Sequence, residues 1–262
     1  MNEVKINLAD DSRIFIKGYY LDEYQKLGQK DYPTVLLVPG GGFNAIPEQE
    51  AERICLAFLN AGYNAFFLRY HLFADLEKPI MPQPLIDLAY AVKTLRENET
   101  EYHMNGDLTI MGLSIGGEIV TQYNGRYIEQ WLQDKVGATV EQLKPNRVVL
   151  GYPVTNFSEG FPKTKEALDK MTDDEDAYYS AKYLGPHSMP TFIWTTWNDE
   201  VVHSMNTISY VKALRENEVP AEVHIFDRGP HGMALATEQT SEKPDEHLAH
   251  WFPLCLEWIK RN

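Results

Sequence analysis

The stretch that decides the fold reads LTIMGLSIGG and spans residues 108–117. Its first four residues have the apolar, partly β-branched character of a buried strand, and Ser114 then stands in a G-x-S-x-G pattern. Such a serine occupies a sharp turn from a strand into a helix, where glycines prevent collisions with both elements. The pattern alone is common, but here a predicted strand precedes it and a predicted helix follows. We therefore predict that Ser114 is a nucleophile; the plain alternative is a glycine-rich turn that only packs a helix on a sheet.

Strand-like and helix-like segments alternate on both sides of this turn. Strands are predicted at residues 3–8, 13–20, 34–38, 64–70, 108–111, 147–152, 191–196 and 222–226. Helices are predicted at residues 48–60, 85–98, 118–132, 205–217 and 248–261. This order predicts an α/β fold with a mostly parallel central sheet and helices on both faces. No linker or repeat divides residues 1–262, so one domain is expected, with an N-terminal hairpin turning at Asp10 and Asp11.

Residues 156–189 form an interval that is long for a plain crossover between two strands. It carries Tyr178, Tyr179 and Tyr183 among many charged residues. Two interpretations stay open, namely a crossover helix with solvated flanks and a small cap or lid insertion over the active site.

A second glycine cluster, Pro-Gly-Gly-Gly at residues 39–42, follows the predicted strand 34–38. Glycines leave backbone N–H groups accessible to a substrate oxygen, as an oxyanion hole requires. We expect the amides of Gly41 or Gly42 to act together with that of Ile115, the residue after the nucleophile. A phosphate-binding loop is excluded because the chain lacks its glycine and lysine spacing here. A tight turn without a ligand is the plain alternative.

A nucleophilic serine needs a histidine base, and His231 is the candidate. It lies in the sequence Asp-Arg-Gly-Pro-His-Gly at residues 227–232, just after the last predicted strand, where sheets of this kind display catalytic groups. His224 falls within that strand, and His247 and His250 lie at a predicted terminal helix, so these are interpreted as structural or surface residues.

The acid that orients the histidine is expected in the loop after strand 191–196. Asp199 is preferred over Glu200 because its shorter side chain and earlier position bring it closer to the end of the strand. Asp227 is the reserve candidate, although a turn residue is the simpler interpretation for it. A helix N-cap is the structural alternative for Asp199.

Composition excludes several classes of function. The formal charge of −14 disfavours nucleic acid and anionic membranes as partners. No apolar stretch approaches the roughly 20 residues that span a bilayer, and no signal peptide is recognised. Cys55 and Cys255 both lie in apolar helical patterns and are expected to be buried thiols, which together with these features predicts a cytoplasmic protein.

No metal or organic cofactor is expected. Glu50, Glu52 and the acidic run at residues 173–176 could suggest metal ligands, but solvated charged faces are far commoner and no His–carboxylate spacing accompanies them. The expected partner is a small-molecule ester, and a homo-oligomer is compatible with the sequence.

With these residues in place, the chain resembles the small bacterial α/β-hydrolases of the acetyl-xylan-esterase-like and feruloyl/acetyl esterase group. The resemblance rests on residues 39–42, 57–63 and 68–70 and on Pro-His-Gly at residues 230–232. Pro39 replaces a histidine that is usual in the wider class, and Ile115 and Glu118 replace the alanine and histidine of the usual Ser-Ala-Gly-Gly-His elbow.

The resemblance implies a serine carboxylesterase that hydrolyses short acyl esters, acetyl esters of sugars or xylo-oligosaccharides above all. The lack of a long apolar segment near the site and the bulk of Ile115 also favour short acyl groups, and the tyrosines of residues 156–189 could contact a sugar. Two alternatives remain: an arylformamidase- or peptidase-like amide hydrolase, and a binding protein that keeps the fold without turnover.

Overall fold

The structure is a computed structural model, which describes residues 1–8, 11–25, 28, 30–77 and 79–262. Of the turn predicted at Asp10 and Asp11, Asp10 lies outside the described residues, and Asp11 is already the first residue of a strand. The two strands that flank this turn pair antiparallel, as predicted.

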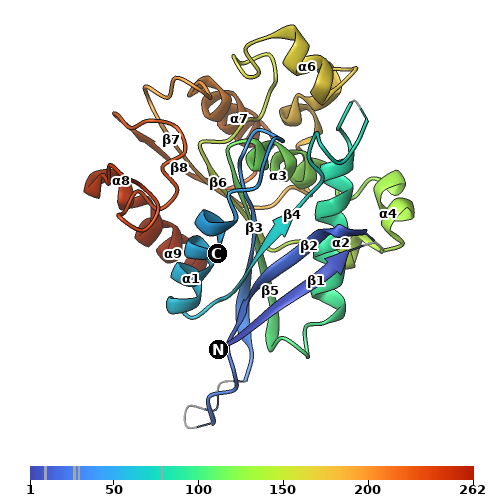
Figure 1. The fold of residues 1–262 in the computed structure, drawn as a ribbon, viewed down its shortest axis with the longest axis vertical. Coiled ribbons are helices and arrows are strands. Elements are labelled where there is room, and N and C mark those ends of the chain that lie inside the picture. The colour runs from blue at the N-terminus through green and yellow to red at the C-terminus, as the bar shows by residue number, and fades with distance from the viewer. Residues whose placement is uncertain (9–10, 26–27, 29, 78) are drawn as a thin grey trace.

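Eight strands form one sheet in the order β1-β2-β4-β3-β5-β6-β7-β8 (Figure 1). Their bounds are β1 Asn2–Leu8, β2 Asp11–Tyr20, β3 Tyr32–Val38, β4 Asn64–Arg69, β5 Met104–Leu113, β6 Arg147–Gly151, β7 Thr191–Thr196 and β8 Ala221–Phe226. The first two strands run antiparallel to their neighbours, and every pair from β4 across to β8 is parallel. Because parallel strands end at one edge, the loops after β3, β5, β7 and β8 meet there.

Helices cover both faces of the sheet. Their bounds are α1 Glu48–Asn60, α2 Gln83–Glu97, α3 Ile115–Arg126, α4 Gln130–Val136, α5 Val140–Leu143, α6 Lys165–Met171, α7 Met205–Glu216, α8 Glu246–Ala249 and α9 Trp251–Arg261. Figure 1 shows α1, α8 and α9 on one side of the sheet and α2 and α4 on the other. The predicted α/β architecture is therefore confirmed.

The two helical layers enclose two hydrophobic cores, which the strands supply with alternate side chains. On β3, Leu36 and Val38 belong to the core shared with α2 and α3. Val35 and Leu37 belong to the core shared with α1 and α9. This double burial explains why the central strands are continuous apolar runs rather than alternating ones.

The helix predicted over residues 118–132 is wrong at its start and in its middle. Helix α3 begins at Ile115, directly after Ser114, and ends at Arg126. Glu129 is extended and α4 starts at Gln130. Apolar residues at helical spacing continue through this break, so the pattern alone suggested one helix. The terminal helix predicted over residues 248–261 is likewise divided, into α8 and α9 at His250.

Residues 156–189 hold only short helices, namely α6, η2 Asp176–Tyr178 and η3 Ser180–Tyr183. The segment packs beside the loop that follows β7 and the start of α7, because Nζ of Lys163 donates to the Glu200 carbonyl at 2.8 Å and Nδ2 of Asn206 donates to the Glu159 carbonyl at 3.0 Å. That the segment acts as a cap or lid stays a prediction.

Two further predictions concern the whole chain. Cys55 and Cys255 are free and buried, as expected. Across the residues that the structure describes, the helices are too short or too polar to cross a lipid bilayer.

Candidate active site

Ser114 stands between β5 and α3 with a backbone conformation, φ 53° and ψ −121°, that few non-glycine residues adopt. Its N–H donates to the Gly151 carbonyl at 3.0 Å, and its carbonyl accepts from the N–H groups of Gly117 and Val154. These backbone bonds to β6 and the following loop hold the serine in its unusual conformation. Strain of this kind is typical of functional turns.

The glycine after Ile115 is required by a close approach. A Cβ on Gly116 would lie only 2.1 Å from the Val38 carbonyl oxygen, at the end of β3. The absence of a side chain therefore lets the start of α3 press against the neighbouring strand. This explains in physical terms why the motif predicted the strand-to-helix turn.

His231 follows β8, and its Nε2 lies 2.8 Å from Oγ of Ser114, although 117 positions separate the two residues in the chain. The ring of Tyr152 packs edge-on against the His231 ring, with centroids 4.9 Å apart. The hydroxyl of Tyr152 accepts a hydrogen bond from the N–H of Ala234, which fixes the chain just beyond the histidine. The imidazole is thus held in place from two directions.

Asp199 lies in the loop after β7, and its Oδ2 is 2.7 Å from Nδ1 of His231. Its side chain is fully buried, whereas His231 is only partly so. The structure thus brings Ser114, His231 and Asp199 into one line of hydrogen bonds. Glu200 and Asp227, the other two carboxylates considered, are exposed.

This line of groups is able to perform nucleophilic catalysis. A serine hydroxyl that donates to an imidazole can lose its proton as it attacks a carbonyl carbon. A carboxylate on the far nitrogen fixes the tautomer and stabilises the imidazolium that forms.

The glycine loop at residues 39–42 passes directly against the serine. A Cβ on Gly40 would lie 3.0 Å from Cβ and 3.7 Å from Oγ of Ser114. Gly41 and Gly42 follow with φ values of 110° and 62°, and none of the loop backbone hydrogen bonds of the described chain uses their N–H groups. These amides are placed beside the nucleophile, and whether they bind an oxyanion stays a prediction.

Ile115 does not narrow the pocket as its bulk had suggested. The side chain of Ile115 is fully buried in the core that α2 and α3 share with the sheet, so its bulk does not line an open surface beside the serine. The role predicted for the backbone N–H of Ile115, donation to an oxyanion, does not depend on this side chain.

The tyrosines of residues 156–189 are also largely structural. Tyr178 is buried and its ring packs on Phe157. Tyr183 donates to the Ala177 carbonyl and lies under the guanidinium of Arg126. Packing within the segment and against α3 therefore accounts for both.

A pocket of about 680 Å³ opens beside His231. Its lining comes from the loops after β7 and β8 and from residues before α8: Asn198, Glu200, Val201, Arg228, Gly229, Pro230, His231, Met233, Lys243, Pro244 and Asp245. Four of these side chains are charged, two of each sign. A cavity of about 750 Å³ elsewhere is lined by residues that precede β5, β6 and β7, at the opposite edge of the sheet, and holds none of the three site residues.

Among the described residues, no three His, Cys, Asp or Glu side chains lie close enough together to bind a metal ion. Glu52 forms an ion pair with Lys17. Burial raises the pKa of Glu50 to about 7.

Sequence reasoning missed two residues that shape the site, Tyr70 and Tyr152. Tyr152 has a positive φ of 38° at the end of β6, and no pattern in the sequence marks it. Tyr70 ends the predicted strand 64–70 and belongs to the resemblance at residues 68–70, but neither pattern indicates that its hydroxyl reaches the glycine loop.

Comparisons with known proteins identify the family and the fold. The sequence model of the BD-FAE family matches residues 21–217, a range that includes Ser114 and Asp199 and ends before His231. Endo-1,4-beta-xylanase B of Butyrivibrio fibrisolvens is 31% identical over 212 residues, which are 78% of this chain. The chain spans 33% of the length of that xylanase.

Solved structures match over nearly the whole chain. A carboxylesterase from Lactobacillus plantarum is 28% identical, with a TM-score of 0.92 and coverage of 100% of this chain and 98% of its own. A sugar hydrolase from Lactococcus lactis is 26% identical, with a TM-score of 0.85 and coverage of 99% and 98%. The predicted α/β-hydrolase fold is thereby confirmed, and the predicted class of ester hydrolase is also that of the first of these neighbours.

Proposed function

Because the chain belongs to the BD-FAE family, we propose that it is a serine carboxylesterase that removes short acyl groups, acetyl above all, from a hydroxyl-rich alcohol such as a sugar or xylo-oligosaccharide. One observation carries the proposal: Oγ of Ser114, the ring of His231 and the carboxylate of Asp199 are joined by contacts of 2.8 and 2.7 Å at the carboxyl edge of the sheet.

In the proposed reaction, Oγ of Ser114 attacks the ester carbonyl carbon while Nε2 of His231 takes the hydroxyl proton. The tetrahedral oxyanion accepts hydrogen bonds from the amides of Ile115 and of Gly41 or Gly42. His231 returns the proton to the departing alcohol, which leaves an acyl-serine. Water then loses a proton to His231 and attacks the acyl carbon, and the acid leaves as the serine hydroxyl is restored.

The pocket beside His231 favours a polar alcohol as the leaving group of the ester. Because His231 hands its proton to the leaving group, the alcohol must sit on the histidine side of the serine, where this pocket opens. Charged and amide side chains in its lining suit hydroxyl groups better than a hydrocarbon chain. Trp197, 63% exposed in the loop that also carries Asp199, offers an indole face of the kind that packs on sugar rings.

The names of the relatives point in the same direction. The matched xylanase and sugar hydrolase are proteins named for carbohydrate substrates, and the carboxylesterase is named for ester hydrolysis. An ester on a carbohydrate is the substrate class that joins the two.

A labelling experiment tests the chemistry. A fluorophosphonate probe should modify the protein once, and mass spectrometry should place the adduct on Ser114, since only an activated serine hydroxyl reacts readily. Turnover is then measured on acetylated xylo-oligosaccharides, on p-nitrophenyl acetate and on matched anilides and formamides. An adduct at another residue would contradict the assignment of Ser114 as the nucleophile. Faster turnover of the amides than of the esters would show that the protein is an amide hydrolase rather than an esterase.

A further inference from the structure

Tyr70 follows β4 directly and contacts the glycine loop from the side of the protein core. Its hydroxyl oxygen lies 2.8 Å from the carbonyl oxygen of Pro39 and 3.1 Å from that of Gly40. We propose that Tyr70 is a positioning residue for ester hydrolysis, and that its hydroxyl sets the direction of the peptide unit that presents the Gly41 N–H to the oxyanion. This inference rests on the proposed function, because the direction of that amide matters only if an oxyanion forms.

Peptide geometry supplies the first step. In a trans peptide, the carbonyl of one residue and the N–H of the next point in opposite directions. Among the described residues the cis bonds precede Pro82 and Pro162, so the bond between Gly40 and Gly41 is trans. When the hydroxyl of Tyr70 holds the Gly40 carbonyl, the Gly41 N–H must point away from Tyr70. That N–H has no partner among the loop backbone hydrogen bonds of the described chain, so it is free to bind substrate.

The second step is that the loop depends on this hydroxyl. Pro39, Gly40 and Tyr70 are all buried, so water cannot readily replace the donor. A phenol has one proton, and the two carbonyls share it. Removing it would leave two buried acceptors without a donor, and a peptide in that position gains by rotating toward another partner. Gly40 offers little resistance to such a rotation, because glycine permits a wide range of backbone angles.

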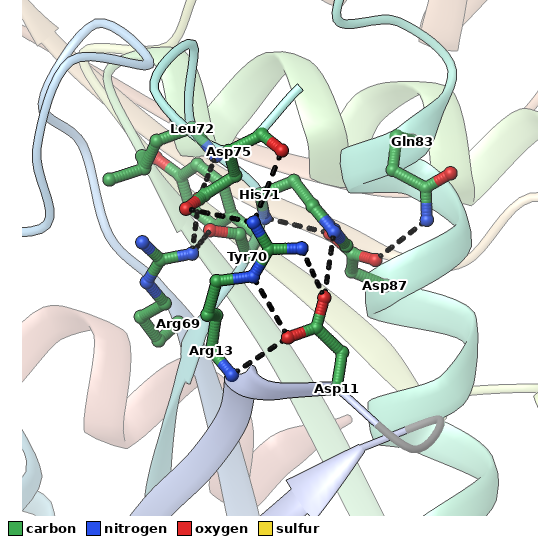
Figure 2. Close-up of polar contacts among 9 residues, drawn as sticks. All are labelled: Asp11, Arg13, Arg69, Tyr70, His71, Leu72, Asp75, Gln83 and Asp87. Carbon is green, nitrogen blue, oxygen red and sulfur yellow. Dashed lines mark hydrogen bonds and ion pairs between the residues drawn. The ribbon is translucent and has the colours of Figure 1, made fainter. Parts of the chain in front are cut away.

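The third step is that Tyr70 itself is held firmly, as Figure 2 shows. Arg69 donates to the Tyr70 carbonyl at 3.1 Å and pairs with Asp75. On the other side, the N–H and Nδ1 of His71 each lie 2.8 Å from Oδ2 of Asp87 on α2. The backbone on both sides of Tyr70 is therefore tied to charged groups, which makes the tyrosine a fixed reference point for the glycine loop.

An aromatic contact joins the same two loops a second time. The ring of Phe43, directly after Gly42, packs edge-on against the rings of Tyr70 and Phe73, with centroids 6.0 and 5.7 Å apart. The N–H of Phe73 donates to the Phe43 carbonyl at 2.9 Å. Phe43 holds the far end of the glycine loop and the hydroxyl of Tyr70 holds its near end, so the amides of Gly41 and Gly42 lie between two anchors.

Burial also raises the pKa of Tyr70 well above its usual range, so the hydroxyl keeps the proton that it donates. The donor is therefore present at every pH at which an esterase of this kind would be assayed.

The test uses Tyr70→Phe, which keeps the ring and removes only the hydroxyl. Its matched control is Tyr123→Phe, because Tyr123 is also fully buried and donates to a single carbonyl, that of Leu143, at 2.6 Å. For each variant, kcat and KM are measured on p-nitrophenyl acetate, together with the inhibition constant of a trifluoromethyl ketone, which forms a tetrahedral oxyanion adduct with an active-site serine.

We expect Tyr70→Phe to lower kcat about 10-fold with KM unchanged, below the roughly 10²–10³ that loss of a whole oxyanion donor costs. Affinity for the trifluoromethyl ketone should fall by the same factor. Tyr123→Phe should lose comparable thermal stability and keep both constants. A kcat within twofold of the wild type in Tyr70→Phe overturns the inference, and so does an equal loss of kcat in both variants.

A second pair of variants covers the case in which Tyr70→Phe does not fold. Asp75→Asn loosens the segment that carries Tyr70, and Asp107→Asn breaks the Arg147–Asp107 pair near the other edge of the sheet. Asp75→Asn should reduce kcat at constant KM, and Asp107→Asn should not; equal kcat values contradict the inference. If the wild-type protein neither hydrolyses esters nor is labelled at Ser114 by the fluorophosphonate, the proposed function itself is contradicted, rather than the inference about Tyr70.

Discussion

Oδ2 of Asp199 lies 2.7 Å from Nδ1 of His231, while Oδ1 of the same carboxylate accepts the N–H groups of Val201 and Val202 at 2.9 Å each. The aspartate is thus anchored by its own loop before it meets the histidine. Its Oδ1 closes a turn within the loop rather than capping a helix, because α7 begins at Met205 with Ser204 as its N-cap; the helix N-cap alternative for Asp199 is therefore wrong.

Replacing Asp199 by Asn should therefore be far more harmful than replacing either neighbouring carboxylate. Asp199→Asn keeps the shape of the loop but favours the wrong tautomer of His231, and we expect kcat to fall on the order of 10⁴. Glu200→Gln and Asp227→Asn should stay near the wild-type rate, because both carboxylates are exposed. Steady-state kinetics on p-nitrophenyl acetate decide this, and a larger loss from Asp227→Asn would transfer the role to that residue.

Ser114→Ala and His231→Ala should each lower kcat by roughly 10⁴–10⁶ and leave the fold intact. Backbone hydrogen bonds, rather than the serine hydroxyl, hold the turn at Ser114. Circular dichroism and the midpoint of thermal unfolding check the folding, and single-turnover assays check the rate. The double variant should be about as slow as either single one, since the two residues act as one unit. Additive losses would argue that the contact between them has no catalytic meaning.

Acyl-chain preference is the sharpest test of the proposed substrate. Burying one methylene group is worth about 0.8 kcal/mol, so a pocket built for long chains would show kcat/KM rising steadily from acetyl to octanoyl esters. We expect acetyl or propionyl to be best and octanoyl poor. The series is measured at constant alcohol so that the leaving-group pocket beside His231 contributes equally. A clear optimum at eight carbons or more would reject the sugar-ester proposal and leave the nucleophile unaffected.

Glu118 should make stability depend on pH. Burial raises its pKa well above the usual range, against the opposing effects of a hydrogen bond from Gln122 and the charge of Arg126. Its Oε2 has no hydrogen-bond partner among the described residues. The folded chain therefore keeps this carboxyl protonated at a pH where the unfolded chain loses the proton. The free energy of unfolding must then fall as pH rises from the unfolded value of 4.5 toward the folded value, by up to about 1.4 kcal/mol per pH unit.

Glu118→Gln keeps the shape of the side chain and removes this dependence. Relative to the wild type, the variant should become more stable as the pH rises above 4.5. Urea unfolding at three pH values measures the difference, with Glu257→Gln as the control, because Glu257 is exposed on α9. Parallel pH profiles for the wild type and Glu118→Gln would show that the carboxyl is already ionised in the folded protein.

Elements with strong local signals were predicted closely. Helix α1 spans Glu48–Asn60 as expected, because two acidic residues in its first turn mark the start and Gly62 follows its end. Strand β7 also has the predicted bounds, since its apolar run is bounded by Pro190 and by a polar loop. The three site residues could be selected because each follows a strand that the pattern identified.

Elements whose limits depend on tertiary contacts were predicted less well. Gly116 and Gly117 disfavour a helix by local propensity, yet α3 includes both. Both positions require glycine because the neighbouring chain leaves no room for a side chain there. The break before α4 is associated with Glu129, which accepts a hydrogen bond from Arg126 and another from Trp131. The importance of Tyr70 depends on a contact with residues about 30 positions away, which no periodicity encodes.

Strand β8 is the last strand of the described chain and lies at the edge of the sheet, beside β7. Ser114 and the glycine loop are synthesised well before it, but His231 takes its place only after β8 has paired with β7. A nascent chain on the ribosome can therefore build most of the sheet while its serine still lacks a base. Activity should appear in a single step when synthesis has passed residue 231 and the edge strand has docked, so shorter ribosome-bound fragments should remain inert toward any ester.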